Sequence, residues 1–287
     1  MTTGATRLGV RRGFLAVPGG TIHYAEAGAG APFLLLHQTP RSWDEYRDVL
    51  PLLGHAVRAI AMDTLGFGDS VNETGEDSIE RYAEAAGDFL DALGVERASI
   101  VGHHTGGVIA LELAARRPEL VERLALSSTP WVDDAFRQER AAGPGVDRVP
   151  TSEDGEHLVG LWRFRQAFYP PGRIDLLERF VVDALRAGPR REEGHRAVYR
   201  YRMEERIALV RAPVLLIRAS DDRFAYEHVT RLAGRLPGSR IVDIEGGMVP
   251  LPDGLPDRFA EAVLQSLELP AATAPGPSSR PRSRAAP

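Results

Sequence analysis

Several groups able to do acid–base chemistry come directly after short apolar segments of the sequence. They are His37, the pair His103-His104 and the pair Asp221-Asp222, which follow residues 33–36, 98–102 and 214–218. In open α/β sheets the carboxyl ends of parallel strands meet at one edge, where ligands bind. Imidazole titrates near neutral pH, so histidines at such an edge can transfer protons to or from a bound molecule.

The composition removes several other kinds of chemistry. All 35 basic residues are arginine, and the chain has no cysteine. Without lysine there is no Schiff base and no P-loop lysine, and without cysteine there is no disulfide, thiolate metal site or thiol nucleophile. A covalent catalyst in this chain is therefore Ser, Thr, Asp, Glu, His or Tyr.

The charge distribution argues against nucleic acid and membrane partners. Residues 1–12 and 270–287 each hold three arginines and no acidic residue, so residues 13–269 hold all 40 acidic residues and a formal charge of −11. Phosphate backbones and anionic lipids need a concentrated positive face, which so acidic a segment lacks. No apolar run approaches the ~20 residues of a membrane span. We expect a cytoplasmic protein.

The chemical groups need a scaffold to bring them together, and the sequence predicts an α/β fold with an eight-stranded, mostly parallel sheet flanked by helices. Short runs of Val, Ile and Leu alternate with segments of helical period, which is the pattern of strands joined by crossover helices. Strands are expected at residues 13–17, 21–26, 33–36, 56–62, 98–102, 121–127, 214–218 and 240–244. Helices are expected at 43–53, 78–93, 107–117, 226–236 and 255–269.

This alternation stops after the sixth strand. Residues 131–210 are rich in aromatic side chains and helical patterns, and we expect them to form a helical cap over one end of the sheet. The predicted organisation is an N-terminal extension (1–12), a core (13–130 and 211–269), the cap (131–210) and a tail (270–287). The tail is rich in Pro and Arg, has nothing to bury, and is predicted to be disordered.

Three turns of the predicted core carry a family resemblance. His37-Gln38-Thr39-Pro40 resembles a His-Gly-x-Pro turn, residues 63–70 resemble Asp-x-x-Gly-x-Gly-x-Ser, and residues 102–106 are similar to the Gly-x-Ser-x-Gly nucleophile elbow. In this order and spacing, the chain resembles the α/β-hydrolase fold superfamily. Its capped members, such as epoxide hydrolases, haloalkane dehalogenases and carbon–carbon bond hydrolases, are the most similar.

The chain departs from this family at two catalytic positions. His104 stands where the elbow has its nucleophile, and Met248 stands where the pattern Gly-Gly-His has the catalytic histidine. Asp222 remains at the position of the triad carboxylate. A serine hydrolase needs a hydroxyl that an imidazole activates. Since both groups are missing from these positions, ordinary ester, epoxide or halide chemistry is not expected.

The resemblance also implies a place for each remaining candidate. The elbow aims the side chain of His104 into the pocket, where we expect a general acid/base oriented by Asp222. The main chain of Thr39 and Thr105 is expected to form a polar hole, with the amide of Gln38 nearby and His37 either supporting the turn or contacting substrate. The predicted substrate contacts are Trp43, Trp131, Trp162, Phe164, Phe168 and Met248. No metal-ligand spacing or dinucleotide fingerprint occurs, so no metal and no cofactor is expected.

These observations predict a cofactor-free, non-hydrolytic enzyme that acts on a hydrophobic small molecule. Carbon–carbon bond formation or cleavage, cyclisation or isomerisation of an aromatic natural-product intermediate in secondary metabolite biosynthesis fits best. Three alternatives stay open. They are a cofactor-independent oxygenase, a non-catalytic binding protein, and a hydrolase with an unrecognised nucleophile. The sequence does not predict the oligomeric state.

Overall fold

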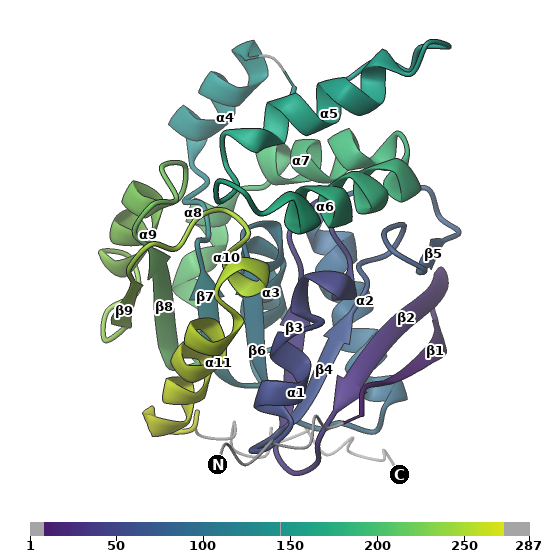
Figure 1. The fold of residues 1–287 in the computed structure, drawn as a ribbon. Helices are drawn as coiled ribbons and strands as arrows, with labels where there is room; N and C mark the ends of the chain where they lie inside the picture. The colour runs from purple at the N-terminus through teal and green to yellow at the C-terminus, as the bar shows by residue number, and fades with distance from the viewer. Residues whose placement is uncertain (1–8, 144, 273–287) are drawn as a thin grey trace, which may run out of the picture.

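A nine-stranded sheet forms the centre of the chain, which a computed structural model describes at residues 9–143 and 145–272 (Figure 1). The strand order is β1-β2-β4-β3-β6-β7-β8-β9, and the short β5 pairs with β2. The strands are β1 Arg11–Val17, β2 Gly20–Ala27, β3 Pro32–Leu36, β4 Arg58–Met62, β5 Val71–Asn72, β6 Ala98–His103, β7 Val121–Ser127, β8 Val214–Ala219 and β9 Arg240–Ile244. The predicted α/β-hydrolase fold is confirmed, with the two-residue β5 as an additional strand.

Strand direction follows the connections. β1, β2 and β4 pair antiparallel, whereas β4, β3 and β6 through β9 pair parallel. The central parallel strands are covered on both faces, and β3 is accordingly a continuous apolar run with four of its five residues buried. Their carboxyl ends therefore meet at one edge, where the sequence places its acid–base groups.

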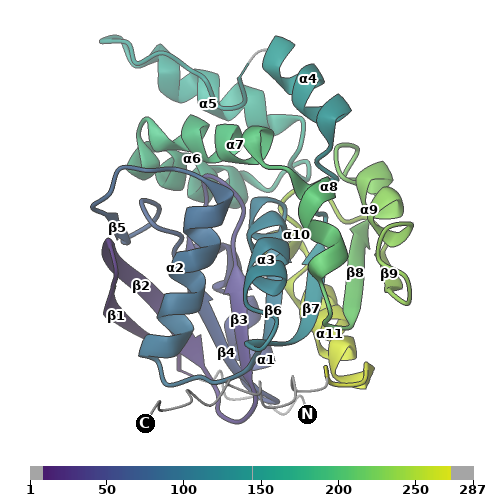
Figure 2. The same ribbon diagram turned by 180° about the vertical axis from the view of Figure 1, so that it is seen from behind.

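Helices cover both faces of the sheet. α1 (Val49–Leu53) and α11 (Pro256–Leu264) cover one face, and α2 (Ile79–Ala92), α3 (Thr105–Arg116) and α9 (Tyr226–Ala233) contribute to the core on the other (Figures 1 and 2). The Ser78 side chain caps α2 by accepting a hydrogen bond from the Arg81 N–H. Each face thus has its own continuous apolar core.

Two of the expected long helices are interrupted. The segment 43–53 forms a short 3-10 helix, η1 (Trp43–Tyr46), followed by α1, and the segment 255–269 forms α11 followed by η3 (Gln265–Glu268). A further short helix, α10 (Leu251–Gly254), precedes α11. In η1 the Asp44 and Glu45 carboxylates bind partners outside the helix, which apolar periodicity does not reveal.

The segment between β7 and β8 folds as a layer of helices over one end of the sheet (Figure 1). Its elements are α4 Asp134–Ala142, α5 Glu156–Gln166, α6 Ile174–Ala187, α7 Arg190–Arg200, α8 Met203–Arg206 and η2 Ile207–Leu209. α7 approaches the core closely at Gly194, where an added Cβ would lie 2.7 Å from the side chain of Thr39 and 2.8 Å from that of Phe67. α7 therefore rests on the turns that follow β3 and β4.

A buried ionic network also joins the cap to the core. Arg41, fully buried, donates to Asp183 of α6 at 2.8 Å and contacts Asp253 of α10. Arg179 of α6 in turn reaches the Asp44 carboxylate at 2.6 Å. These charges leave water and pair with one another, which fixes the geometry in which α6 meets the core.

Most of the predicted disordered tail and of the N-terminal extension lies outside the described residues. Residues 270–272 are described and bind the core, since the Ala272 N–H donates to the Glu122 carbonyl at 3.1 Å and its carbonyl accepts from Arg97. The start of the predicted tail is therefore ordered against the sheet. Among the described residues, no helix has the length and apolar character needed to span a membrane.

Candidate active site

The turn between β6 and α3 holds His104 in a strained backbone conformation. Its φ is 47° and its ψ is −113°, a region that residues other than glycine seldom adopt. Glycines on either side allow the tight turn, because a Cβ on Gly102 would lie 2.2 Å from the Gly106 carbonyl oxygen, and one on Gly106 would lie 1.9 Å from that of Leu36. The geometry is that of a nucleophile elbow with an imidazole at its tip.

His104 binds the carboxylate at the end of β8 directly. Its Nε2 lies 2.8 Å from Oδ2 of Asp222, which is fully buried. Burial raises the pKa of Asp222, but the charge and hydrogen bond of His104 and the Ala225 N–H outweigh it, so that the pKa lies below its ordinary value. A carboxylate only accepts hydrogen bonds, so Nε2 carries the proton. Among the described residues no hydrogen bond reaches Nδ1, which is left with a free lone pair.

The neighbouring His103 forms hydrogen bonds within the core through both ring nitrogens. Its Nε2 donates to the Val249 carbonyl at 2.8 Å, and its Nδ1 lies 3.0 Å from the Ser127 hydroxyl. Burial and the charge of His104 lower the pKa of His103 to about 3, so the ring is neutral at physiological pH. Both nitrogens are occupied, and His103 fastens the end of β6 to the loop that follows Met248.

Aromatic side chains surround His104. Phe224 stacks on its ring with a centroid separation of 5.9 Å and an interplanar angle of 17°. The ring centroid of Phe136, on α4, lies 6.4 Å from that of Phe224 and 5.9 Å from that of Tyr199 on α7. Arg140 lies over both phenylalanine rings. The surroundings of His104 are thus apolar and aromatic, and come from both the core and the cap.

The turn after β3 is fixed by hydrogen bonds of its own. The Nε2 of His37 accepts from the Thr64 N–H at 2.9 Å, so its Nδ1 carries the proton and donates to the Gln38 carbonyl. Both the main-chain N–H and the side-chain amide of Gln38 donate to Glu45, at 2.9 and 2.6 Å. His37 therefore supports the turn, and the Gln38 amide is engaged by Glu45.

Thr39 lies in the turn after β3, and Thr105 directly follows His104. Thr105 is the first residue of α3, where main-chain N–H groups have no partner within the helix. Thr39 is buried beneath Gly194 of the cap. These positions are where the resemblance implies a polar hole, and the start of α3 adds the positive end of a helix dipole.

The structure gives the predicted pocket aromatics other contacts. Trp43 packs on His23 and beneath Arg12, and Trp131 donates to Asp133 and lies under Arg235. Trp162 and Phe168 pack against the small core of the cap, and Phe164 is exposed. Met248 is half-buried, between the carbonyls of Gly247 and Val249, which accept from Asp221 and His103. Trp131, Trp162 and Phe168 thus belong to apolar cores and Phe164 to the surface, whereas Trp43 lines a cavity between η1 and α6.

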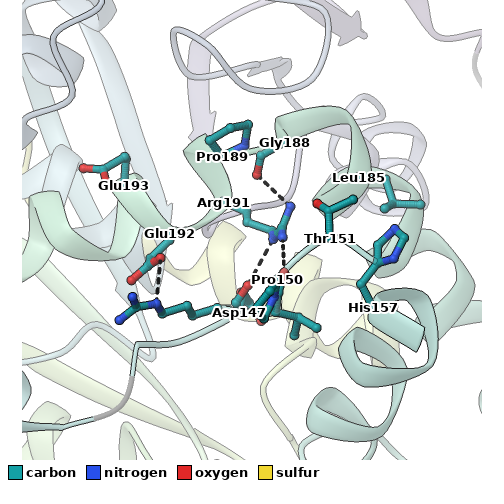
Figure 3. Close-up of a pocket in the computed structure, with 12 residues that line it drawn as sticks. Asp147, Pro150, Thr151, His157, Leu185, Gly188, Pro189, Arg191, Glu192 and Glu193 are labelled. Atoms are coloured by element: carbon teal, nitrogen blue, oxygen red, sulfur yellow. Dashed lines mark hydrogen bonds and ion pairs between the residues drawn. The ribbon is translucent and has the colours of Figure 1, made fainter. Parts of the chain in front are cut away.

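Two cavities lie away from His104. One, of about 590 Å³, lies within the cap around Arg191, whose guanidinium donates to the carbonyls of Asp147, Val149 and Gly188 (Figure 3). The other, of about 760 Å³, lies between η1 and α6. Neither is lined by His104, whose side chain keeps 10% of its surface exposed.

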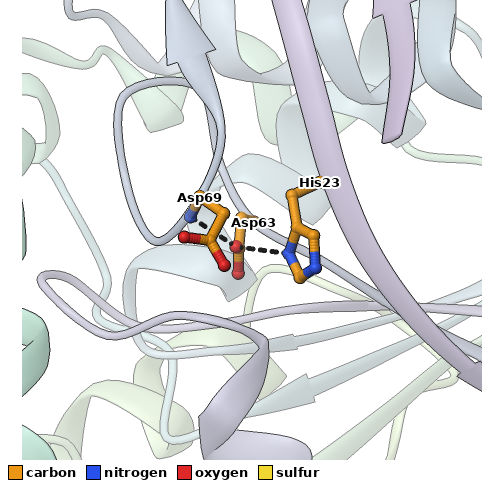
Figure 4. Close-up of side chains that lie close together, drawn as sticks. All are labelled: His23, Asp63 and Asp69. Atoms are coloured by element: carbon orange, nitrogen blue, oxygen red, sulfur yellow. Dashed lines mark hydrogen bonds and ion pairs between the residues drawn. The ribbon is translucent and has the colours of Figure 1, made fainter. Parts of the chain in front are cut away.

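One histidine and two aspartates form a separate cluster at the edge of the core. His23, Asp63 and Asp69 have ligand atoms within 4.8 Å of one another (Figure 4). These atoms are already engaged, because His23 Nδ1 lies 2.8 Å from Asp63, its Nε2 accepts from Arg12, and Asp69 accepts from Arg12 at 2.6 Å. The donor set is a closed hydrogen-bond network with an arginine where a cation would sit, which does not fit a metal site.

Sequence reasoning missed several residues around His104. Phe224 was detectable, since it follows Asp222 by two positions on the same loop. Phe136 and Tyr199 come from the cap, and their orientation depends on how α4 and α7 pack, for which the sequence carries no local signal.

Comparison with known proteins supports the fold. The family model described as alpha/beta hydrolase fold matches residues 31–254. Haloalkane dehalogenase 2 of Mycobacterium tuberculosis is 29% identical over 266 residues, which cover 86% of this chain and 91% of that protein. A soluble epoxide hydrolase of a Corynebacterium species is 38% identical over 109 residues, 38% of each chain. The crystal structure of a hydrolase from Pseudomonas aeruginosa superimposes with a TM-score of 0.74 at 25% identity, covering 90% of this chain and 98% of the other.

The chain therefore belongs to the α/β-hydrolase fold family, and its relatives include enzymes that cleave carbon–halogen and epoxide bonds by name.

Proposed function

We propose that this protein is an enzyme in which His104 and Asp222 form a general acid–base pair that works without a covalent nucleophile and without a cofactor. The observation that carries the proposal is the contact of 2.8 Å between His104 Nε2 and Asp222, combined with a free Nδ1. In the usual triad, the carboxylate orients an imidazole, which activates a separate hydroxyl. Here the imidazole itself occupies the elbow.

The geometry supports proton transfer at one atom. Nδ1 of His104 takes a proton from a bound substrate, and the Asp222 carboxylate stabilises the resulting imidazolium through Nε2. The same nitrogen returns the proton at a later step. Main-chain N–H groups at Thr39 and Thr105 stabilise negative charge that develops on a substrate oxygen meanwhile.

This chemistry suits a non-hydrolytic reaction on a hydrophobic, aromatic small molecule. Carbon–carbon bond formation or cleavage, cyclisation and isomerisation all need a proton moved next to an activated carbon or oxygen. The Phe224 and Phe136 rings offer flat apolar contacts to such a substrate. A substrate carbanion that reacts directly with dioxygen would give the oxygenase variant, which oxygen consumption would reveal.

Hydrolysis is a second candidate, and the relatives support it, since they are named as hydrolases and dehalogenases. In this case His104 Nδ1 deprotonates a water molecule, which attacks the substrate without an acyl-enzyme. A fluorophosphonate probe separates this candidate from a conventional serine hydrolase. We expect no labelling of the protein, whereas a labelled peptide would identify an unrecognised nucleophile.

A proton-abstraction probe tests the proposal directly. Nitrobenzisoxazole opens when a base removes the C–H proton of its isoxazole ring, and its flat aromatic shape matches the surroundings of His104. We expect wild-type protein to accelerate the opening and His104→Ala to lose at least about 100-fold in kcat/KM, the usual contribution of a general base. The exposed His55 provides the control, since His55→Ala should retain the wild-type rate. Equal rates in wild type and His104→Ala would refute the proposal.

A further inference from the structure

A second histidine–aspartate pair lies within the cap. The Nε2 of His195, on α7, lies 3.0 Å from Oδ2 of Asp147. Asp147 is almost fully buried and also accepts two hydrogen bonds from the guanidinium of Arg165, through Nε at 2.8 Å and through a terminal nitrogen. The pKa of Asp147 lies far below its ordinary value because the charges and hydrogen bonds of Arg165 and His195 outweigh burial. The carboxylate is therefore an anion throughout the physiological range.

This anion fixes the tautomer of His195. A carboxylate oxygen accepts hydrogen bonds, so Nε2 of His195 carries the proton, and Arg165 approaches the same nitrogen at 3.5 Å. Among the described residues no hydrogen bond reaches Nδ1. His195 thus has the same arrangement as His104, with one ring nitrogen on a buried aspartate and the other one free.

α7 brings this pair toward the candidate active site. Gly194 rests on Thr39, so α7 meets the turn after β3 one residue before His195. One helical turn further on, Tyr199 contacts Phe136, which contacts the ring stacked on His104. His195 keeps 15% of its side-chain surface exposed, and His104 keeps 10%. The two free nitrogens therefore belong to partly open rings on opposite sides of the boundary between cap and core.

The charges of the two rings interact. Burial lowers the pKa of His195, Asp147 raises it through a hydrogen bond and its charge, and the charges of Arg165 and His104 lower it, so that it lies below its ordinary value. His195 is consequently neutral near pH 7. A protonated His195 therefore gives up its proton more readily than a free imidazolium.

We propose that His195 is a second catalytic residue and that it exchanges protons with the substrate from the cap side while His104 does so from the core side. This inference rests on the proposed function of His104. In one turnover, Nδ1 of His104 takes a proton as a substrate C–H or O–H bond breaks, and the electron pair stays on the substrate. His195, in its protonated form, donates its Nδ1 proton to a second substrate atom. The substrate thus loses one proton and gains one, as an isomerisation requires, and exchange with water restores the starting state.

The nitrobenzisoxazole reaction tests both roles, because one group removes the C–H proton and another can donate a hydrogen bond to the phenolate oxygen that develops as the N–O bond breaks. We expect a bell-shaped pH profile for wild-type protein. His195→Gln retains a donor toward Asp147, and it should lose about 10-fold or more in kcat and keep only one limb of the bell. His157→Gln, in the cap at the Arg191 cavity, should behave as wild type.

The outcomes separate the two proposals. A large loss in His104→Ala with a wild-type rate and profile in His195→Gln would overturn the role of His195 alone. No loss in His104→Ala would overturn the role of His104 and this inference with it. Nitrogen-15 NMR of the histidine rings provides a measurement free of substrate. The pKa of His195 should rise in His104→Ala, and an unchanged titration would contradict the placement of the two rings at one site.

Discussion

The Nε2 of His104 lies 2.8 Å from Oδ2 of Asp222, so an imidazole on the elbow reaches the carboxylate that normally serves a separate histidine. Among the described residues no hydrogen bond reaches Nδ1, so the free nitrogen is carried by the residue at the tip of the elbow. Met248, which stands where the family resemblance implies the catalytic histidine, is half-buried.

The elbow requires glycine at position 106. A Cβ there would lie 1.9 Å from the main-chain oxygen of Leu36, and that strand is central and cannot shift. We expect Gly106→Ala to lower the free energy of unfolding by about 3 kcal/mol or more, within the range for overpacking against rigid backbone. Denaturant unfolding followed by circular dichroism measures this change. Gly234→Ala, whose nearest neighbour lies 3.5 Å away, should show no such loss.

Close packing of the cap on the core depends on Gly194. A methyl group there would press on Thr39 and Phe67, whose side chains are buried. Gly194→Ala should destabilise the protein by about 1–3 kcal/mol although alanine favours helix, and should increase proteolysis of the cap. Limited proteolysis with mass spectrometry detects the cleavage. Unchanged stability together with unchanged cleavage would show that α7 does not rest on this turn.

Glu45 makes the stability depend on pH. Burial raises its pKa to about 8, against the charge of Arg41 and the two donors of Gln38. The pKa of Glu45 in the unfolded chain is near 4.5, so the folded state binds this proton more tightly than the unfolded state. The contribution of Glu45 to the free energy of unfolding therefore falls as pH rises from about 4.5 to 8. Urea unfolding at several pH values should show a smaller fall for Glu45→Gln. The exposed Glu73→Gln serves as the control, and equal slopes in wild type and Glu45→Gln would contradict this assignment.

Arg41 holds the junction between α6 and the core. Removing it leaves the buried carboxylates of Asp183 and Asp253 without their main partner. We expect Arg41→Ala to cost about 3–5 kcal/mol of unfolding free energy, as for other broken buried ion pairs. Arg196 forms ion pairs at the surface, and Arg196→Ala should leave the unfolding midpoint nearly unchanged. Similar midpoints for the two variants would show that the network is dispensable.

The sequence was sufficient to predict the scaffold and the turn that carries His104. Strand positions follow from apolar runs such as that of β3, and the elbow follows from the small residues Gly102 and Gly106. These signals are local, so one sequence carries them. The contact between His104 and Asp222 joins residues 118 positions apart, and only the packing of β6, β7 and β8 establishes its length.

The surroundings of His104 were less predictable, because they depend on how the cap packs. Trp131 and Trp162 were expected at the substrate, but large aromatic side chains also stabilise the cores in which they lie. His195 carries no sequence motif, and its position depends on the approach of α7 at Gly194. Helix periodicity predicts which face of a cap helix is apolar, without predicting which turn of the core it meets.

Rescue of His104→Ala by free imidazole tests the central claim most directly. Removing the ring leaves a space beside the buried Asp222 carboxylate, which can bind and orient imidazole from solution. If His104 is the proton-transfer group, imidazole should restore part of the lost nitrobenzisoxazole rate in His104→Ala, with saturation, and should restore much less in the double variant His104→Ala/Asp222→Asn. If imidazole gives the same small increase in both variants, or if His104→Ala retains the wild-type rate, His104 is not the acid–base catalyst.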